Sequence, residues 1–389
     1  MSSSVPGADA DVIVLGAGAV GSAAAWRLAR RGARVIAIDR WSPPHAHGST
    51  HGRTRIIREA YFEDPAYVPL VQRAYALWAE LERESGHTLF ARTGGVMVGP
   101  PDGTLVAGAR RSALQHGLPH EELSAAELRR RCPGFAPRPD MVGLYEPRAG
   151  VLFPERCVEA MLARAAALGA ELRLDTLARW WRVRRGTVVV DTVHGTLRAR
   201  RLIVAAGAWM PAVVPGLPAA LTVERQVVHW FAPRAHPEWF DASHAPVSIW
   251  EHEPERMFYT IPDLGDGLKA AVHHEGELVS PDAPRTPPAP GESEAVRALL
   301  ARYLPDAAGA LREAATCLYT NTPDRHFLID VHPGHDAVLM ASACSGHGFK
   351  FATAIGEALA EWSLEGGATL DLAPFRLARF TRPDGSTAS

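Results

Sequence analysis

A glycine-rich segment between two apolar runs opens the sequence and constrains the fold more than any other feature. Residues 11–15 and 34–38 are short, nearly continuous apolar runs, as expected of buried parallel strands. Residues 22–30 between them carry apolar side chains at helical spacing. The first run leads into GAGAVG at residues 16–21, and the second ends at Asp39. This order predicts a βαβ unit that binds a dinucleotide.

Each glycine has its own role in such a unit. Gly16 makes the tight turn, Gly18 lets a pyrophosphate approach the backbone, and Gly21 lets the helix pack against the strand. The free N–H groups of the helix N-terminus bind the pyrophosphate. Asp39 would accept a hydrogen bond from a ribose hydroxyl and repel a 2′-phosphate. Only one fingerprint occurs, so we expect one dinucleotide, either NAD or FAD, and an electron partner of another kind.

The length and the order of the segments predict two interleaved lobes. A chain of 389 residues exceeds the size at which one core usually stops growing, about 250–300 residues. Nucleotide-type segments occur at the start, middle and end, and β-rich segments lie between them. The predicted fold class is α/β, with two lobes. A Rossmann-like domain of residues 1–89, 149–216 and 322–389 alternates with a mainly antiparallel β-sheet domain of residues 90–148 and 217–321.

Apolar periodicity predicts the other elements that matter for the argument. Residues 89–99 are expected to form a strand pair, and residues 171–206 contain three strand-like runs. The other expected elements are helices at 67–84, 154–168, 294–303 and 349–364, and strands at 221–231, 247–250, 257–261, 267–273, 315–320, 327–330 and 337–341.

Composition excludes several classes of partner and location. The net charge of −2 gives no basic excess, so we expect no nucleic acid partner. No apolar run approaches the roughly 20 residues that span a bilayer. Residues 1–11 lack the pattern of a signal peptide, and residues 386–389 are no peroxisomal tripeptide. The four cysteines show no metal spacing and indicate a reducing compartment. We therefore expect a cytoplasmic protein without a membrane segment or metal.

Lysine is almost absent from this sequence. Of the 41 basic residues, 39 are arginine, and the two lysines are Lys269 and Lys350. A GC-rich genome that replaces lysine with arginine explains the imbalance, and composition alone favours this explanation. Alternatively, these two positions need a compact ammonium that a guanidinium does not supply.

Strand periodicity groups several of the polar residues. Cys317 and Tyr319 are two residues apart on a predicted strand and therefore share one face. Lys269 and His273 are four apart on another strand and also share a face, with the small Ala271 between them. Each pair therefore presents its two side chains on the same face of its own strand.

Seven segments match one known family, and the last three, in their order and spacing, are far more specific than a dinucleotide fingerprint. The seven are residues 16–21, 51–58 (HGRTRIIR), 67–70 (YVPL), 150–153 (GVLF), 203–209 (IVAAGAW), 317–320 (CLYT) and 345–350 (SGHGFK). The chain resembles the monomeric sarcosine oxidase and N-methyltryptophan oxidase family of D-amino-acid-oxidase-like FAD-dependent oxidoreductases, almost from end to end. The resemblance implies an FAD-binding domain, a substrate domain and a monomer.

The resemblance also implies the reaction. It implies oxidation of the N-methyl or ring C–N bond of a secondary amino acid to an imine, with O₂ reduced to H₂O₂. It implies that Cys317 holds FAD through an 8α-thioether.

Catalytic and substrate-binding residues follow by the same resemblance. Lys269 would lie over the flavin and activate O₂, because a fixed cation stabilises superoxide. Tyr259 and His273 would lie near the substrate, and Arg55 near the flavin ring. Arg58 and Lys350 would bind the substrate carboxylate, which the planar guanidinium suits, and Tyr319 would face the substrate. The implied cofactor-binding residues are Gly16, Gly18, Gly21, Asp39, Ser49, Thr50, Arg55, Ile56, Gly207, Cys317, Gly346, Gly348, Phe349 and Lys350. The N-terminus of the last helix would direct its N–H groups toward the flavin.

The sequence departs from the family at two positions and leaves alternatives open. Thr50 stands where the family commonly has a histidine, and Arg53 where it has an acid. The substrate is alternatively a cyclic imino acid such as pipecolate or proline, or an intermediate of a biosynthetic tailoring reaction. An NAD-dependent dehydrogenase and a flavin-binding protein without turnover are the alternatives from other classes. Trp230, Trp239 and Trp250 either line an aromatic pocket or pack the sheet.

Overall fold

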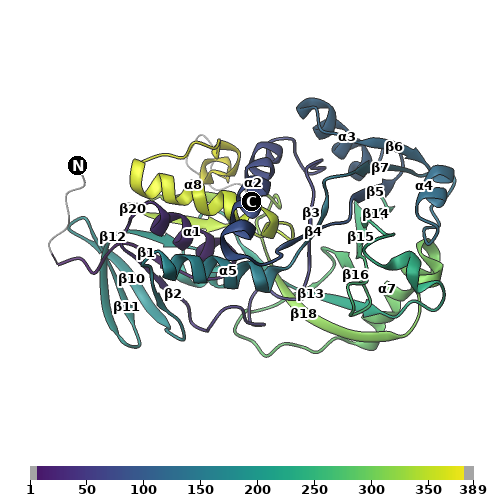
Figure 1. Cartoon of the computed structure of the whole chain (residues 1–389). Coiled ribbons are helices and arrows are strands. Elements are labelled where there is room, and N and C mark those ends of the chain that lie inside the picture. Colours follow the sequence, from purple (N-terminus) through teal and green to yellow (C-terminus); the bar gives the residue numbers. More distant parts are fainter. Residues whose placement is uncertain (1–6, 381–389) are drawn as a thin grey trace.

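The computed structural model describes residues 7–380, and its first sheet carries the predicted βαβ unit (Figure 1). The leader and peroxisomal expectations for residues 1–6 and 386–389 fall outside the described residues. The parallel core of this sheet consists, in spatial order, of β20 (His335–Ser342), β12 (Gly195–Val204), β1 (Ala10–Leu15), β2 (Val35–Ile38) and β9 (Glu171–Arg173). Antiparallel strands extend it, namely β19 (Leu328–His332), β10 (Ala178–Arg184) and β11 (Thr187–Thr192).

Both faces of this sheet are buried, which explains the continuous apolar runs. Val12 and Val14 of β1 belong to the core under the helices, whereas Ile13 and Leu15 belong to a second core on the opposite face. The helices of this first core are α1 (Ala19–Arg30), α5 (Pro154–Ala167) and α8 (Ala352–Glu365), with α2 (Tyr67–Ser85) packed against α5 and α8. The second face is covered by β10, β11 and α6 (Met210–Val213).

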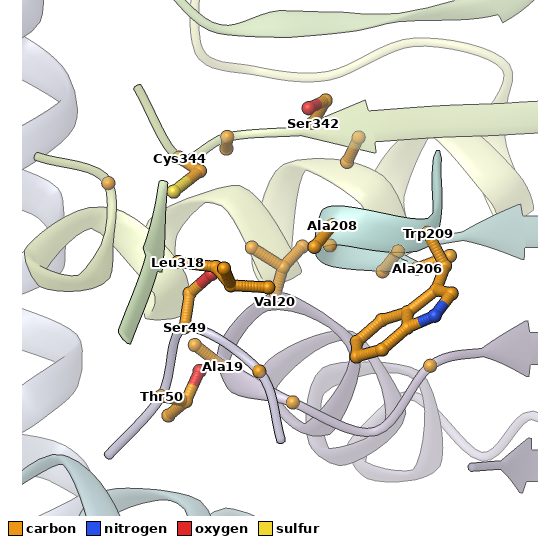
Figure 2. A pocket seen from close by; sticks show the side chains of 18 of the residues that line it. Ala19, Val20, Ser49, Thr50, Ala206, Ala208, Trp209, Leu318, Ser342 and Cys344 are labelled. Carbon is orange, nitrogen blue, oxygen red and sulfur yellow. The ribbon is translucent and has the colours of Figure 1, made fainter. Parts of the chain in front are cut away.

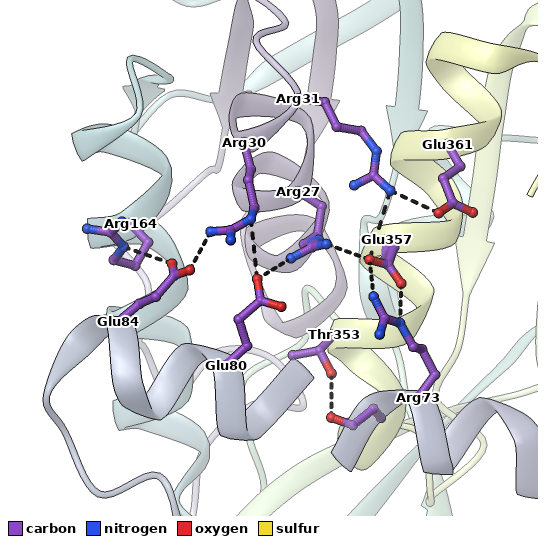
Figure 3. Close-up of polar contacts among 11 residues, drawn as sticks. Arg27, Arg30, Arg31, Arg73, Glu80, Glu84, Arg164, Thr353, Glu357 and Glu361 are labelled. Carbon is purple, nitrogen blue, oxygen red and sulfur yellow. Dashed lines mark hydrogen bonds and ion pairs between the residues drawn. The ribbon is translucent and has the colours of Figure 1, made fainter. Parts of the chain in front are cut away.

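A network of ion pairs joins α1, α2, α5 and α8 (Figure 3). The carboxylate of Glu357 on α8 accepts hydrogen bonds from Arg27 of α1 and from Arg73 of α2, the latter at 2.6 Å. Arg27 also pairs with Glu80 of α2 at 2.7 Å. Segments more than three hundred residues apart in sequence are therefore held together by buried charge.

The second sheet is mainly antiparallel. Its strands lie in the order β17 (Glu277–Leu278), β13 (Thr222–Phe231), β16 (Leu268–His273), β15 (Arg256–Ile261), β14 (Val247–Glu253), β5 (Gly95–Gly99), β7 (Val142–Glu146) and β6 (Glu121–Ser124), with β18 (Leu311–Asn321) on β13. The β14–β5 pair is parallel. Helices α3 (Thr104–His116), α4 (Ala125–Arg131) and α7 (Pro290–Tyr303) pack around it, and a small sheet of β3 (Arg55–Ile57), β8 (Gly150–Leu152) and β4 (Phe90–Arg92) completes the strands that concern the site.

The α/β class is confirmed, with a parallel sheet and an antiparallel sheet between which the chain alternates. Within residues 7–380, no helix combines the length and apolar character needed to span a bilayer.

Several predicted elements differ from the structure. The strand pair expected at 89–99 is wrong, because β4 and β5 belong to different sheets. Residues 171–206 contain four strands instead of three. Helix α7 begins earlier than predicted, at Pro290, because proline suits the first helical position and Glu292 accepts the Ala289 N–H. The last helix begins later, at Ala352, after a 3₁₀ turn over Phe349–Phe351.

Candidate active site

One elongated cavity of about 780 Å³ extends from the βαβ unit to the antiparallel sheet. Its wall contains every predicted site residue except Gly21 and Lys269. Figure 2 shows part of this cavity, whose wall there includes Ala19, Val20, Ser49, Thr50, Ala206, Ala208, Trp209, Leu318, Ser342 and Cys344. The structure thus brings together residues from the start, middle and end of the chain.

The glycine turn has the geometry that its sequence predicts. Gly16 has a φ of +98°, and a Cβ there would lie 2.4 Å from the Ala205 carbonyl oxygen. A Cβ on Gly21 would lie 1.7 Å from the Gly16 carbonyl oxygen, so Gly21 packs the helix and does not face the cavity. At Gly18, the nearest atom to a Cβ is the Thr50 Oγ1 at 3.8 Å. The backbone at Gly18 is therefore open to a ligand in the cavity.

Polar groups at this end of the cavity are oriented by the backbone. Asp39 accepts hydrogen bonds from the N–H groups of Ala17 at 2.7 Å and Trp41 at 3.0 Å. The N-terminal N–H groups of α1 have no partner within the helix. The Ser49 hydroxyl is buried in the cavity wall without a hydrogen-bond partner among the described residues. These groups suit a ribose and a pyrophosphate.

Tyrosine, histidine and cysteine side chains line the opposite end. Cys317 and Tyr319 of β18 both face the cavity, as their spacing predicts. His273 of β16 lies with its Nδ1 3.3 Å from the Tyr319 hydroxyl. Tyr259 of β15 is the neighbour of Ala271 in the sheet. Burial lowers the pKa of His273 well below its usual range and raises the pKa values of both tyrosines, so all three side chains are neutral near pH 7.

Gly346 leaves room for the side chains of Tyr319 and His273. It has a φ of +78°, and a Cβ there would lie 2.6 Å from Tyr319 and 2.8 Å from His273. Alternation along a strand predicts that His274, the neighbour of His273, points away from the site, but its ring also contacts Tyr319, with 5.3 Å between ring centroids. It does so because its φ of +60° turns the chain out of β16.

Lys269 lies behind the cavity wall and is 1% exposed. Its ammonium donates to the carbonyl oxygens of Gly52 at 2.7 Å and Thr54 at 3.0 Å. Arg55 binds the same loop, donating to the carbonyls of Thr54, Ser49 and His51. Burial, with the charge of Arg55, lowers the Lys269 pKa well below its usual value. Lys269 and Arg55 thus hold the loop of residues 49–54 by its carbonyl groups.

Arg58 already has a carboxylate partner within the chain. Its Nη2 donates to both oxygens of Glu63, at 2.9 and 2.7 Å, and its Nη1 donates to the Ala60 carbonyl. Burial alone would lower the Arg58 pKa, but Glu63 holds it above its ordinary value. Both residues line the cavity.

Lys350 is the second cation in this part of the wall. It lies on the 3₁₀ turn before α8 and donates to the His347 carbonyl at 2.8 Å and to the Tyr61 hydroxyl at 3.4 Å. Burial and the nearby charge of Arg58 lower its pKa to about 7. Arg58, Glu63 and a charged Lys350 together carry one excess positive charge.

Comparison with known proteins assigns the family. The family model described as DAO, FAD dependent oxidoreductase, matches residues 11–362. The chain is 44% identical over 360 residues to a monomeric sarcosine oxidase from Streptomyces avermitilis, covering 92% of this chain and 94% of that protein.

The chain belongs to the DAO family of FAD-dependent oxidoreductases. It is also 36% identical over 374 residues to an N-methyl-L-tryptophan oxidase from Yersinia pestis, covering 96% of this chain and all of that protein. An L-proline dehydrogenase structure from P. horikoshii shares the fold, with a TM-score of 0.83 at 22% identity, covering 98% of this chain and 100% of that chain.

Membership of the DAO family decides between the two dinucleotides in favour of FAD. The cavity fits this cofactor on its own chemistry. Gly18 leaves the backbone open, Ser49 offers an unpartnered hydroxyl, and Asp39 is oriented as an acceptor. The far end contains neutral polar side chains and the cations Arg55, Arg58 and Lys350, which suits the flavin and an anionic substrate.

Sequence reasoning missed the residues that support the cations in this oxidoreductase. Tyr61, Glu63 and His347 contact Arg58 or Lys350, although none was predicted for the site. His347 lies within the SGHGFK segment, and this motif was the sequence feature that could have indicated its role.

Trp230, Trp239 and Trp250 do not line the cavity, which settles that they pack the sheet. Arg53 pairs with Glu313 at 2.6 Å and lies over the Trp230 ring.

Proposed function

We propose that this DAO-family oxidoreductase oxidises the CH–NH bond of a secondary, N-methyl amino acid to an imine, with O₂ as electron acceptor and H₂O₂ as product. The observation that carries the proposal is the placement of Arg58 and Lys350 at the end of the cavity that also contains Tyr319 and His273. Relatives over more than nine-tenths of the chain are named sarcosine oxidase and N-methyl-L-tryptophan oxidase.

The two cations account for the acidic part of the substrate. A carboxylate in a buried site needs opposite charge and hydrogen-bond donors. Arg58 offers a planar set of donors, and Lys350 a compact ammonium. The excess positive charge left after the Arg58–Glu63 pair is the charge that an amino acid carboxylate neutralises.

The neutral side chains account for the amine part. His273, Tyr259 and Tyr319 are buried and uncharged near pH 7, so they do not compensate an ammonium ion. Such surroundings favour the neutral amine, whose nitrogen lone pair is needed for imine formation. FAD, when bound, accepts the two electrons of the C–H bond.

Two further roles belong to this proposal. Lys269 supplies a fixed positive charge for the reduction of O₂. Cys317 attaches the cofactor covalently; burial raises the pKa of its thiol, and the charges of Arg55 and Lys269 oppose that rise.

The setting of the reaction is also part of the proposal. The protein acts as a monomer in the cytoplasm, in keeping with four cysteines that are all free. Its FAD-binding domain consists of residues 1–89, 149–216 and 322–389, of which 1–6 and 381–389 lie outside the described residues, and its substrate domain of residues 90–148 and 217–321.

The test is an H₂O₂ assay on the purified holoenzyme with sarcosine, N-methyltryptophan, pipecolate and proline. Dimethylamine, which is sarcosine without the carboxylate, is the matched control. We expect H₂O₂ with at least one N-methyl amino acid and a much lower kcat/KM for dimethylamine. A flavin-containing preparation that produces no H₂O₂ with any of the amino acids would contradict the proposal. A preference for pipecolate or proline would show that the substrate is a cyclic imino acid instead of an N-methyl amino acid.

A further inference from the structure

Tyr61 contacts both candidate carboxylate-binding cations. It is completely buried and lies behind the cavity wall. The Arg58 Cζ is 4.1 Å from the centroid of the Tyr61 ring. The Lys350 Nζ is 5.3 Å from the same centroid and 3.4 Å from the Tyr61 hydroxyl oxygen. A single aromatic side chain therefore supports the two charges that face the substrate.

His347 fixes the direction of the Tyr61 hydroxyl. The Nε2 of His347 is 3.1 Å from the Arg325 carbonyl oxygen, which can only accept, so we assign the ring proton to Nε2. Burial lowers the pKa of His347 to about 3, so the ring is neutral and its Nδ1 is an acceptor. The Tyr61 hydroxyl donates to this Nδ1 at 2.7 Å. The oxygen of the hydroxyl then presents its lone pairs to the Lys350 ammonium.

The Tyr61 ring has little freedom to move. It packs against the rings of Tyr67 at 4.7 Å and Phe351 at 5.1 Å between centroids. The Ser112 hydroxyl donates to its backbone carbonyl. A rigid ring held in this way fixes the positions of the cations on its surface.

We propose that Tyr61 is a positioning residue that sets the spacing of Arg58 and Lys350 and stabilises the charged form of Lys350, and so determines the preference for ligands with a carboxylate. The proposal rests on the proposed function, because it assumes that the two cations bind a carboxylate. A ring face and a hydroxyl oxygen both stabilise a desolvated ammonium. The other charged groups that face Lys350 are Arg58 and Arg55, which oppose its charge, and Glu63, which supports it.

Removal of the Tyr61 hydroxyl should shift the pH dependence of carboxylate binding in one direction. Affinity for a carboxylate requires charged Lys350, so it falls as pH rises through the Lys350 pKa, about 7 in the protein as it stands. In Tyr61→Phe the charged form loses its acceptor, the pKa falls further, and the loss of affinity begins at lower pH. Tyr61→Leu also removes the ring under Arg58 and has the larger effect.

The experiment measures binding by calorimetry on the holoenzyme between pH 6 and 9, and needs no turnover. The probe is methoxyacetate, in which an ether oxygen replaces the amine of sarcosine, and the neutral control is 2-methoxyethanol. We expect Tyr61→Phe to weaken methoxyacetate binding roughly three- to tenfold at pH 7 and to move its pH midpoint downward. Binding of 2-methoxyethanol should not change.

Tyr67→Phe is the matched control, because its hydroxyl contacts His326 at 3.0 Å and not Lys350. It should leave both the affinity and the pH midpoint as in the wild type. Wild-type affinity and midpoint in Tyr61→Phe would overturn the proposal, and so would an equal effect in Tyr67→Phe. If methoxyacetate binds the wild type no better than 2-methoxyethanol, the proposed function fails instead. Should Tyr61→Phe not fold, His347→Gln tests the same hydrogen bond from its other side, with the same expected direction.

Discussion

Lys269 is buried, and among residues 7–380 its ammonium contacts two carbonyl oxygens and a hydroxyl but no carboxylate. Its Nζ lies 5.2 Å from the Trp230 ring centroid, and burial depresses its pKa. A charge without a counter-ion in a dry setting is costly to maintain. It is therefore well suited to stabilise a negative charge that forms during the reaction, which is the requirement of O₂ reduction.

We expect Lys269→Met to slow reoxidation of the reduced enzyme by O₂ about a hundredfold, with a much smaller effect on reduction by the substrate. Stopped-flow spectroscopy separates the two half-reactions. Arg53→Met is the matched control, since Arg53 is a cation over the same Trp230 ring but is 42% exposed. Equal slowing of both half-reactions in Lys269→Met would remove its role in O₂ activation.

At the residue scale, the sequence is informative where a contact is local. The two-residue period of a strand is enough to place Cys317 and Tyr319 on one face, and both line the cavity. The Tyr61–His347 hydrogen bond joins residues 286 positions apart, from a loop without periodicity. No local pattern predicts such a pair, so the support of Lys350 became visible only in the folded structure.

Among the elements, α8 is where sequence-distant helices meet. The pKa of Glu357 would be raised by burial, but the hydrogen bonds from Arg73 and the charge of Arg27 hold it below its ordinary value of 4.5. Because the pKa in the folded state is depressed, the ion pairs stabilise the protein above about pH 4.5. Their contribution is lost as pH falls through the depressed pKa.

We expect Glu357→Gln to reduce the free energy of unfolding by about 3 kcal/mol at pH 7, since it removes the carboxylate that pairs with both Arg27 and Arg73 and leaves the buried Arg27 with Glu80 alone. The difference from the wild type should shrink as the pH is lowered below 4.5. Thermal and urea unfolding at several pH values measure it. In Glu122→Gln, which breaks an exposed pair with Arg110, the loss should stay within about 1 kcal/mol. A difference that does not change with pH would show that Glu357 stabilises by packing alone.

Element types followed from the sequence better than sheet membership did. The helices at 67–84 and 154–168 were predicted within one residue at either end, because a helix is encoded by local periodicity. The strands expected as a pair at 89–99 joined different sheets, because strand pairing depends on contacts remote in sequence. The position of Lys350 just before α8 depended on a 3₁₀ turn that periodicity does not distinguish from a helix.

On the scale of the whole molecule, the cavity joins the two sheets. Gly16 and Asp39 border it from the parallel sheet, and Tyr259, His273 and Cys317 from the antiparallel sheet. A cofactor that spans this cavity binds only the folded arrangement of both, so it stabilises them together.

Cys317→Ala tests this linkage and the covalent bond at once. We expect the wild type to keep its yellow flavin after acid precipitation and the variant to release it, because the variant lacks the thiol.

The variant can then be freed of FAD under native conditions. Without FAD it should unfold at a lower temperature, and FAD at about 100 times its Kd should restore roughly 2.7 kcal/mol of stability. One cooperative transition is expected with FAD bound. If the wild type also releases its flavin in acid, the thioether is absent, and if FAD stabilises only one of two separate transitions, the two sheets are not linked through the cavity.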